Sequence, residues 1–159
     1  MKDESLNIEM KLGGRSSRYV LGPLACLELG HFVPHPPPVY IIDGAVAELH
    51  PKWLEQIQAG CDPREHPTLV LPGGEGVKTP ERLLAIWDWL ASHNVPRDGS
   101  VVAVGGGTIL DVVGFAASTW RRGVHFIAIP TTLLAMVDAA IGGKTAVNAV
   151  GLKNPVGPF

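Results

Sequence analysis

The sequence predicts an α/β fold, a Rossmann-like parallel sheet with helices on both faces. Two observations predict it: short apolar runs alternate with segments of helical spacing, and glycine clusters follow several of the runs. Alternation at this spacing calls for crossover connections, which give parallel strands covered by helices on both sides. At 159 residues the chain is about one domain long. We therefore expect one α/β domain over residues 1–159.

Four apolar runs suit strands that are covered on both faces, and four segments between and after them suit helices. The expected strands lie within 39–44, 68–74, 100–107 and 124–130, and the expected helices at 45–60, 79–95, 108–123 and 131–144. The alternating stretch 16–22 is expected to be an edge strand. Pro51 is expected to kink the helix at 45–60 or to delay its start.

The helix at 79–95 has the clearest signals. Thr79 is expected to cap it, and Pro80 occupies the first helical position. Its apolar face is expected to contain Leu83, Leu84, Trp87 and Leu90.

Composition excludes several classes of protein. A net charge of -2 gives no surface suited to nucleic acid or to an acidic membrane. The N-terminal segment lacks the basic-then-apolar order of a signal peptide, and no stretch approaches the ~18 apolar residues of a membrane span. Cys26 and Cys61 have no ligand-type spacing; a structural pair is one interpretation, and two inert thiols in a reducing cytoplasm is the favoured one. We expect a cytoplasmic protein.

The conspicuous polar and glycine motifs fall at one predicted edge of the sheet. Asp43, Gly73, Gly105 and Thr131 each come at the predicted carboxyl end of a strand. Ligands of open α/β sheets bind at this edge. We therefore expect the binding site there.

GGGTILD at 105–111 delivers three glycines into the start of a helix. The free backbone N–H groups and the positive end of the helix attract phosphate, and glycine lets a pyrophosphate lie against the backbone. Asp111 lies on the first helical turn, where its carboxylate can cap amides or face a ribose hydroxyl. A tight strand-to-helix turn without a ligand is the alternative.

LPGGEGVK at 71–78 is a glycine-rich turn with Glu75 and Lys78 ahead of a helix. On local grounds an ordinary charged, exposed turn explains it better than a binding site does. Asp43 is a candidate for contacts with adenosine ribose hydroxyls. A turn-forming Asp-Gly explains Asp43 equally well.

IPTTLLAMVDAAIGGKTAVN at 129–148 is the most informative segment. Thr131 and Thr132 place two hydroxyls at a helix start, and Asp138 is a carboxylate in an otherwise apolar helix. Burying such a carboxylate is costly unless it is paired or functional. Lys144 is placed to reach Asp138 or a ligand, and a structural salt bridge is the alternative.

Two further cationic groups flank this segment. Lys153 and Asn154 suit an anionic polyol, and also suit an exposed loop. Arg121 and Arg122 end the preceding helix, where cations are favoured, but two are more than capping requires.

Three segments, taken in order, resemble 3-dehydroquinate synthase, a member of the sugar phosphate cyclases. They are GGGTILDVVGFAASTWRRG, IPTTLLAMVDAAIGGKTAVN and GLKNPVGPF. The resemblance is dense over 99–159 and weaker at LPGGEGVK and IIDG. It implies an N-terminal NAD-binding α/β domain and a C-terminal helical domain that holds a divalent metal. Two departures are Gly44 and Ala45 after Asp43, and the sequence VGLK at 150–153.

The resemblance implies roles for individual residues. Those expected to hold NAD are Asp43, Gly74, Glu75, Lys78, Gly105, Gly106, Gly107, Thr108, Asp111, Thr131, Thr132, Lys144 and Lys153. Those expected at the substrate are Asp138, Lys144, Lys153 and Asn154, with Arg122 on the substrate phosphate, often across a dimer interface. A homodimer is expected in the full-length enzyme.

The activity that the resemblance implies is carbon-oxygen lyase chemistry in the shikimate pathway. A phosphorylated sugar acid, 3-deoxy-D-arabino-heptulosonate 7-phosphate, becomes 3-dehydroquinate and phosphate, and NAD is recycled within each turnover. The metal, zinc or cobalt, is expected only with the C-terminal domain, because its Glu and His ligands lie beyond Phe159. We interpret the end of the chain as a cut between domains, and expect residues 1–159 alone to be inactive.

Three alternatives remain open. One is another sugar phosphate cyclase, of the aminocyclitol or valiolone type. A metal-dependent polyol dehydrogenase is the second, although VDAAIGGKTAVN and LKN favour a cyclase. The third is a nucleotide-binding module without catalytic activity.

Overall fold

A computed structural model describes residues 6–12, 15–22, 37–52, 55 and 66–158. The chain divides into two compact units, Met1–Phe32 and Val33–Phe159. Cys26 and Cys61 lie outside the described residues, as does most of the predicted helix at 45–60 after Lys52.

The first unit contains an antiparallel hairpin. Strand β1, Leu6–Leu12, pairs with β2, Arg15–Leu21, in a register that sets Leu6 opposite Leu21. The strand predicted at 16–22 is therefore present, but its partner is β1 and not the parallel sheet. Sequence reasoning did not predict β1, although its apolar and polar side chains alternate with the period of a half-exposed strand.

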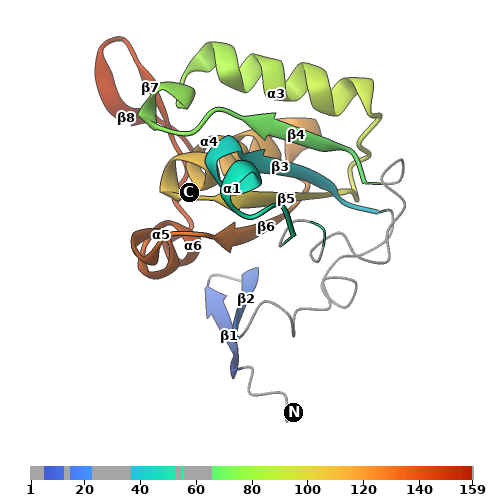
Figure 1. The fold of residues 1–159 in the computed structure, drawn as a ribbon, viewed down its shortest axis with the longest axis vertical. Coiled ribbons are helices and arrows are strands. Elements are labelled where there is room, and N and C mark those ends of the chain that lie inside the picture. The colour runs from blue at the N-terminus through green and yellow to red at the C-terminus, as the bar shows by residue number, and fades with distance from the viewer. Residues whose placement is uncertain (1–5, 13–14, 23–36, 53–54, 56–65, 159) are drawn as a thin grey trace. The chain divides into compact units, whose positions relative to one another are not determined.

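The second unit contains a four-stranded parallel sheet with the order β4-β3-β5-β6 (Figure 1). Its strands are β3 Val39–Asp43, β4 Thr68–Leu71, β5 Ser100–Gly105 and β6 His125–Pro130. The chain leaves β3 toward β4 on one side and returns to β5 and β6 on the other. This reversal is the position at which open α/β sheets bind ligands.

Burial along the strands follows their places in the sheet. All six residues of β5 are buried, as are the first four of β3, while β4 and β6 at the two edges have exposed positions. Central strands covered on both faces read as continuous apolar runs, as these two do. The predicted fold class, a parallel sheet with helices on both faces, is confirmed.

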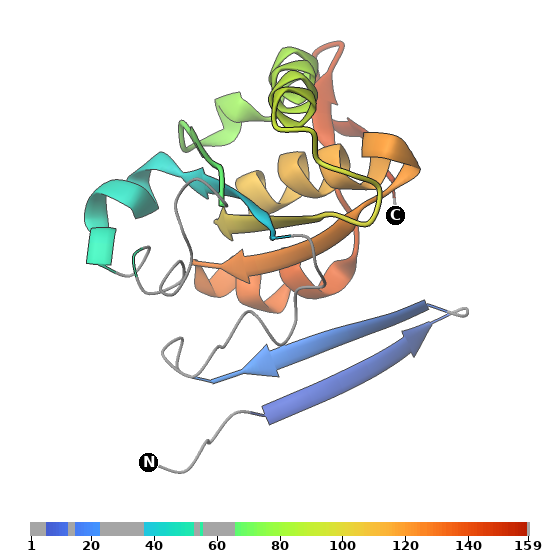
Figure 2. The ribbon, with the colours of Figure 1, turned by 90° about the vertical axis from the view of Figure 1, so that its right-hand side faces the viewer.

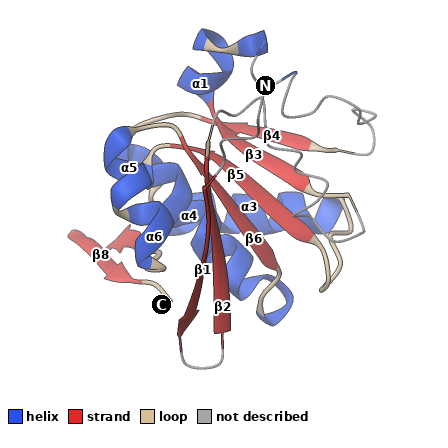
Figure 3. Cartoon of the chain, turned by 90° about the horizontal axis from the view of Figure 1, so that it is seen from below, coloured by secondary structure: helices blue, strands red, loops and turns tan. Residues whose placement is uncertain are grey.

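Helices cover both faces of this sheet. α3, Pro80–Ser92, and α4, Gly107–Thr119, lie together on one face, and the short helices after β6 lie on the other (Figure 2). α4 is buried along most of its length because it lies between the sheet and α3. Seen from below, the strands lie side by side and α5 and α6 gather at one end of them (Figure 3).

α3 begins as its sequence predicts. The Thr79 side chain accepts a hydrogen bond from Arg82 N at 3.2 Å, and Pro80 is the first helical residue. Its buried residues are Leu83, Ile86 and Leu90. The assignment of Leu84 to the apolar face was wrong, because Leu84 is 56% exposed and Ile86 takes the buried position one turn before Leu90.

α1, Gly44–Leu49, is shorter than the predicted helix. It begins at Asp43, which caps it, and its C-cap is His50, immediately before Pro51. Proline lacks a backbone N–H and clashes with the preceding turn, which explains a boundary at this point.

The predicted helix at 131–144 is two short helices instead of one. α5 is Leu133–Val137 and α6 is Ala139–Gly142, and Asp138 between them has φ -129 and ψ -84, outside the helical region. Aspartate favours helix starts over helix interiors, because its side chain competes for backbone groups. The single helix was therefore a wrong prediction.

A second hairpin follows α6 and was not predicted. β7, Val147–Ala149, pairs antiparallel with β8, Leu152–Val156, and β7 contacts α3 and α4. Val147 is buried against these helices, whereas β8 is exposed throughout. This hairpin brings Asn148 and Asn154 to the sheet edge described next.

No helix in the described part of the chain combines the length and apolar character needed to cross a membrane.

Candidate functional site

The carboxyl ends of the four parallel strands lie level with one another. Asp43 is paired with Leu71, and Gly105 is paired with Pro130. The Thr131 N–H donates to Gly105 O at 3.0 Å, which ties the turn after β6 to the end of β5. The predicted clustering of motifs at one edge of the sheet is therefore confirmed.

The three glycines after β5 are not equivalent. A Cβ on Gly105 would lie 2.8 Å from Ile109 Cβ, so packing alone requires glycine there. Gly106 has φ -74 and ψ 178, which any residue adopts, and a Cβ there would meet nothing closer than Thr132 Cγ2 at 3.5 Å. The nearest atom to a Cβ on Gly107 would be Ala139 Cβ at 3.6 Å. Neither backbone conformation nor packing accounts for these two glycines.

The same turn leaves the start of α4 open. Gly106 is the N-cap residue and has no side chain to cap the helix. The first N–H groups of a helix have no partners within the helix, and the helix dipole adds a positive potential. An open glycine turn before an uncapped helix is the arrangement that binds phosphate groups.

Asp43 has a structural role at the end of β3. Its Oδ1 accepts a hydrogen bond from Ala45 N at 2.9 Å and caps α1. A Cβ on Gly73 would lie 2.9 Å from the same oxygen, so the carboxylate lies against the turn after β4. The turn-forming interpretation of Asp43 explains these contacts.

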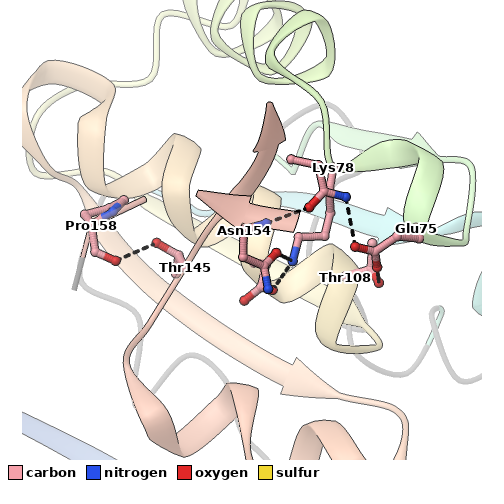
Figure 4. Close-up of polar contacts among 8 residues, drawn as sticks. Glu75, Lys78, Thr108, Thr145, Asn154 and Pro158 are labelled. Atoms are coloured by element: carbon pink, nitrogen blue, oxygen red, sulfur yellow. Dashed lines mark hydrogen bonds and ion pairs between the residues drawn. The ribbon is translucent and has the colours of Figure 1, made fainter. Parts of the chain in front are cut away.

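Lys78 lies inside the protein. Its side chain is 3% exposed, and Nζ contacts Asp111 Oδ2 and Asn154 Oδ1, each at 2.5 Å (Figure 4). Asp111 is in the first turns of α4, and Asn154 is in β8. The interpretation of 71–78 as an ordinary exposed charged turn is wrong for Lys78, since its ammonium group joins three separate segments.

Glu75, three residues before Lys78, is exposed. Its Oε2 accepts from Thr108 Oγ1 at 3.3 Å, and its Oε1 accepts from Asn148 Nδ2 at 2.9 Å. The hydrogen bond from Asn148 lowers the pKa of the Glu75 carboxyl below its ordinary value of 4.5; burial opposes this, and the ammonium groups of Lys78 and Lys153 lower it further. Glu75 is therefore held as a carboxylate beside the N-terminus of α4.

The residues after β6 occupy the same edge. Thr132 caps α5 by accepting from Ala135 N at 3.2 Å. Asp138 is exposed at the break between α5 and α6, so the argument from a costly buried carboxylate does not apply to it. Lys144 and Lys153 are also exposed.

Arg122 is not brought to this edge. It follows α4, and a helix of 13 residues is about 20 Å long. α4 starts at the glycine turn, so Arg122 lies near the opposite edge of the sheet. Arg121 and Arg122 are exposed, with φ of 48° and 69°.

Asn148 is the functional candidate that sequence reasoning missed. Its side chain and backbone make three hydrogen bonds, to Glu75, Lys78 and Asn154. The one signal in the sequence was an amide side chain within the otherwise apolar run AVNAV at 146–150.

Within the residues that the structure describes, no three His, Cys, Asp or Glu side chains are grouped so as to hold a metal ion.

Comparison with known proteins agrees with the fold and with the motifs. Residues 68–159 match the family model described as 3-dehydroquinate synthase N-terminal. A 3-dehydroquinate synthase from Roseobacter denitrificans (strain ATCC 33942 / OCh 114) is 46% identical over 135 residues, which cover 82% of this chain and 36% of the relative. One from Legionella pneumophila (strain Corby) is 47% identical over 109 residues, 69% of this chain and 30% of the relative. The chain thus spans about a third of the length of these relatives.

Two solved structures share the fold. One is 2-epi-5-epi-valiolone synthase from Streptomyces hygroscopicus subsp. jinggangensis 5008 with NAD+ and Zn2+ bound, with a TM-score of 0.73 and 34% identity over 86% of this chain and 38% of that one. The other is 2-deoxy-scyllo-inosose synthase complexed with carbaglucose-6-phosphate, NAD+ and Co2+, with a TM-score of 0.81 and 26% identity over 97% of this chain and 43% of that one. Because the family model covers most of the parallel sheet and most of the candidate edge, the chain belongs to the 3-dehydroquinate synthase N-terminal family.

Proposed function

We propose that this chain supplies the NAD-binding part of a 3-dehydroquinate synthase. The reaction is the conversion of 3-deoxy-D-arabino-heptulosonate 7-phosphate to 3-dehydroquinate and phosphate. Membership of the family supports this function, and so do the two structural relatives whose descriptions include NAD+. The α/β edge with its glycine turn is the place where this chain meets the cofactor.

The observation that carries the proposal is Gly106. Its φ of -74 suits any residue and a Cβ would have room against Thr132, yet the residue is glycine at an uncapped helix start. A pyrophosphate that lies directly on the backbone explains the missing side chain. The donors would be the free N–H groups of Gly107 and Thr108.

The remaining contacts to NAD follow from position along the edge. Asp43 at the end of β3 would face a ribose, and Gly74 and Glu75 would border the nucleotide from the turn after β4. Thr131 and Thr132 would border it from the turn after β6. The bound NAD would supply a reversible hydride acceptor, used and restored within one turnover. The protein's part is to hold the reacting groups in position and exclude water.

Lys78 and Asp111 would act through the protein framework. The Lys78 ammonium is enclosed by Asp111 and Asn154, so its contribution is to fix the start of α4 relative to β8. A buried cation left without its partner would be strongly destabilising. The Lys78–Asp111 ion pair would thus stabilise the cofactor site without contacting NAD.

The substrate would lie beyond the nicotinamide, among exposed charged groups. Lys144 and Lys153 supply positive charge for a phosphorylated sugar acid, and Asp138 and Asn154 supply hydrogen-bonding groups. The zinc or cobalt ion predicted for the enzyme has no ligand set among the described residues. The homodimer, the cytoplasmic location and the domain boundary at 1–159 stay predictions.

The second candidate is another sugar phosphate cyclase. The likeness to 2-epi-5-epi-valiolone synthase and 2-deoxy-scyllo-inosose synthase favours it, and the higher identity to 3-dehydroquinate synthases favours the first candidate. Incubating the full-length protein with the heptulosonate phosphate, NAD and a divalent metal tests both. Release of phosphate without net formation of NADH is expected.

Two other results would redirect the proposal. Cyclisation of a different sugar phosphate, without reaction of the heptulosonate phosphate, would support the second candidate. Steady formation of NADH from a simple polyol would indicate a dehydrogenase instead. Residues 1–159 alone are expected to release no phosphate, and turnover equal to that of the full-length protein would show that the site has been placed wrongly.

A further inference from the structure

Asn148, in β7, makes hydrogen bonds to two other segments of the candidate edge, the turn at 75–78 and β8. Its backbone N–H donates to Lys78 O at 2.8 Å, and its Nδ2 donates to Glu75 Oε1 at 2.9 Å. Its Oδ1 accepts from Asn154 N at 2.9 Å. One residue in β7 thus joins the turn before α3 to the strand β8.

These contacts require an amide side chain. A carboxylate only accepts hydrogen bonds and a backbone N–H only donates, so the neighbours Glu75 and Asn154 set the orientation of the amide without ambiguity. Aspartate has the same shape as asparagine, but it would place a second carboxylate oxygen against Glu75. Alanine would lose both side-chain bonds.

The position of Glu75 makes this orientation important. Its other oxygen accepts from Thr108 Oγ1 at 3.3 Å, in the first turn of α4 and next to Gly106 and Gly107. A helix N-terminus attracts carboxylates as it attracts phosphate. A Glu75 side chain without a fixed direction would compete with a pyrophosphate for the same N–H groups.

Asn154 is the second group that Asn148 holds. It has φ of 54° inside β8, a left-handed conformation that costs energy for a residue other than glycine. The bond from Asn154 N to Asn148 stabilises this conformation, and the Asn154 side chain in turn contacts the Lys78 ammonium. The neighbouring Lys153 is thereby presented from a fixed strand.

We propose that Asn148 is a positioning residue that holds the Glu75 carboxylate and the 153–154 segment in the arrangement needed to bind NAD. This inference rests on the proposed NAD-binding function.

Asn148→Asp in the full-length protein is the test, with NAD affinity measured by calorimetry. At about pH 7, NAD should bind ~10-fold or more weakly, because a hydrogen bond to a charged group is replaced by repulsion between carboxylates. Near pH 5 the loss should shrink, because repulsion raises the pKa of the carboxyl pair and a shared proton restores the bond. Val150→Asp, which adds the same charge at the exposed hairpin tip, is the matched control and should bind NAD as the wild type does.

The double variant Glu75→Gln with Asn148→Asp separates positioning from general damage. In it the new amide at position 75 donates to the new carboxylate at position 148, so the bond between the two side chains is regained with reversed polarity. The carboxylate can still accept from Asn154 N, as the asparagine side chain does. NAD affinity of the double variant should lie within about 2-fold of that of Glu75→Gln alone. Unfolding free energies measured in parallel show whether each variant is folded, and the double variant keeps the test valid if Asn148→Asp does not fold.

Three results would overturn the inference. The first is a folded Asn148→Asp protein with wild-type NAD affinity. The second is a double variant that remains ~10-fold weaker than Glu75→Gln. An equal loss in Val150→Asp is the third, because charge alone would then explain the effect. If the wild-type protein itself fails to bind NAD, the proposed function fails first, and the role of Asn148 fails with it.

Discussion

Two neighbouring glycines at the end of β5 should respond to alanine in opposite ways. At Gly105 the added Cβ would lie 2.8 Å from Ile109 Cβ and 3.0 Å from its Cγ1 and Cγ2, closer than such atoms approach. Both residues are buried, and Ile109 is branched at Cβ with little freedom to rotate. Gly105→Ala should lower the free energy of unfolding by ~1–3 kcal/mol through overpacking.

At Gly106 the same change has room. The nearest atom to its Cβ would be Thr132 Cγ2 at 3.5 Å, an ordinary contact, and φ -74 is available to alanine. The unfolding free energy should fall by less than about 1 kcal/mol, the size of an N-cap effect. NAD affinity should fall by ~10-fold or more, because a methyl group stands where the pyrophosphate meets the backbone and a charge-assisted hydrogen bond is worth about 1.5–3 kcal/mol.

Denaturant unfolding and calorimetric titration with NAD, on both variants of the full-length protein, measure the two effects separately. Gly106→Val provides a larger obstruction at the same position and should bind NAD more weakly than Gly106→Ala. The reasoning is refuted if folded Gly106→Ala binds NAD as tightly as the wild type. It is also refuted if Gly105→Ala unfolds at the wild-type denaturant concentration, since the packing argument that distinguishes the two glycines would then be wrong.

Three further predictions concern stability. Alanine for a glycine inside a helix usually stabilises a protein by about 1 kcal/mol. Gly114→Ala should instead lower the unfolding free energy by ~1–3 kcal/mol, because its Cβ would lie 2.6 Å from Thr145 Cγ2 and 3.3 Å from the Phe126 ring. Thr145→Ser removes Cγ2, so the double variant should regain most of the lost stability. Val150 has φ of 49° in the two-residue turn between β7 and β8, a conformation that favours asparagine over valine. Val150→Asn should therefore raise the unfolding free energy by ~1 kcal/mol, and an unchanged value would contradict this turn conformation. Because the folded-state pKa of Glu75 lies below 4.5, its carboxylate contributes stability above pH 4.5, and this contribution is lost as the pH falls through the folded-state pKa. The unfolding free energy of the wild type relative to Glu75→Gln should therefore rise as the pH is raised from below the folded-state pKa to 4.5. Parallel pH profiles of the two proteins would contradict the shift.

The parallel sheet was predictable because its central strands carry their own signal. The inner residues of β3 and β5 are apolar, and the two strands end at Asp43 and Gly105, residue types that favour turns. α3 was predictable for the same kind of reason, since Thr79 and Pro80 mark its start locally. In each case the determining interactions lie within a few residues of one another.

Three of the features that were missed depend on contacts between distant segments. β8 is exposed along its whole length and contains Pro155, so no apolar period marks it, and its turn has Val150 where a hairpin signal would have Asn or Gly. The sequence alone does not decide whether Leu84 or Ile86 lies on the buried face of α3, because this depends on how α3 packs against α4. Asn148 has only a weak signal in the sequence, and its proposed role rests on partners as far as 73 residues away along the chain.

The candidate residues are separated along α4. Those at the carboxyl edge of the sheet surround the turn at Gly106, whereas Arg122 lies at the other end of α4, about 20 Å away. An extended arginine side chain does not bridge that separation, and α4 is packed between the sheet and α3 and is not free to turn. The resemblance to the family implies that Arg122 contacts the substrate phosphate, and its distance from the glycine turn favours a contact in the site of another copy. The predicted role of Arg122 therefore depends on the predicted homodimer, whereas the homodimer does not depend on that role.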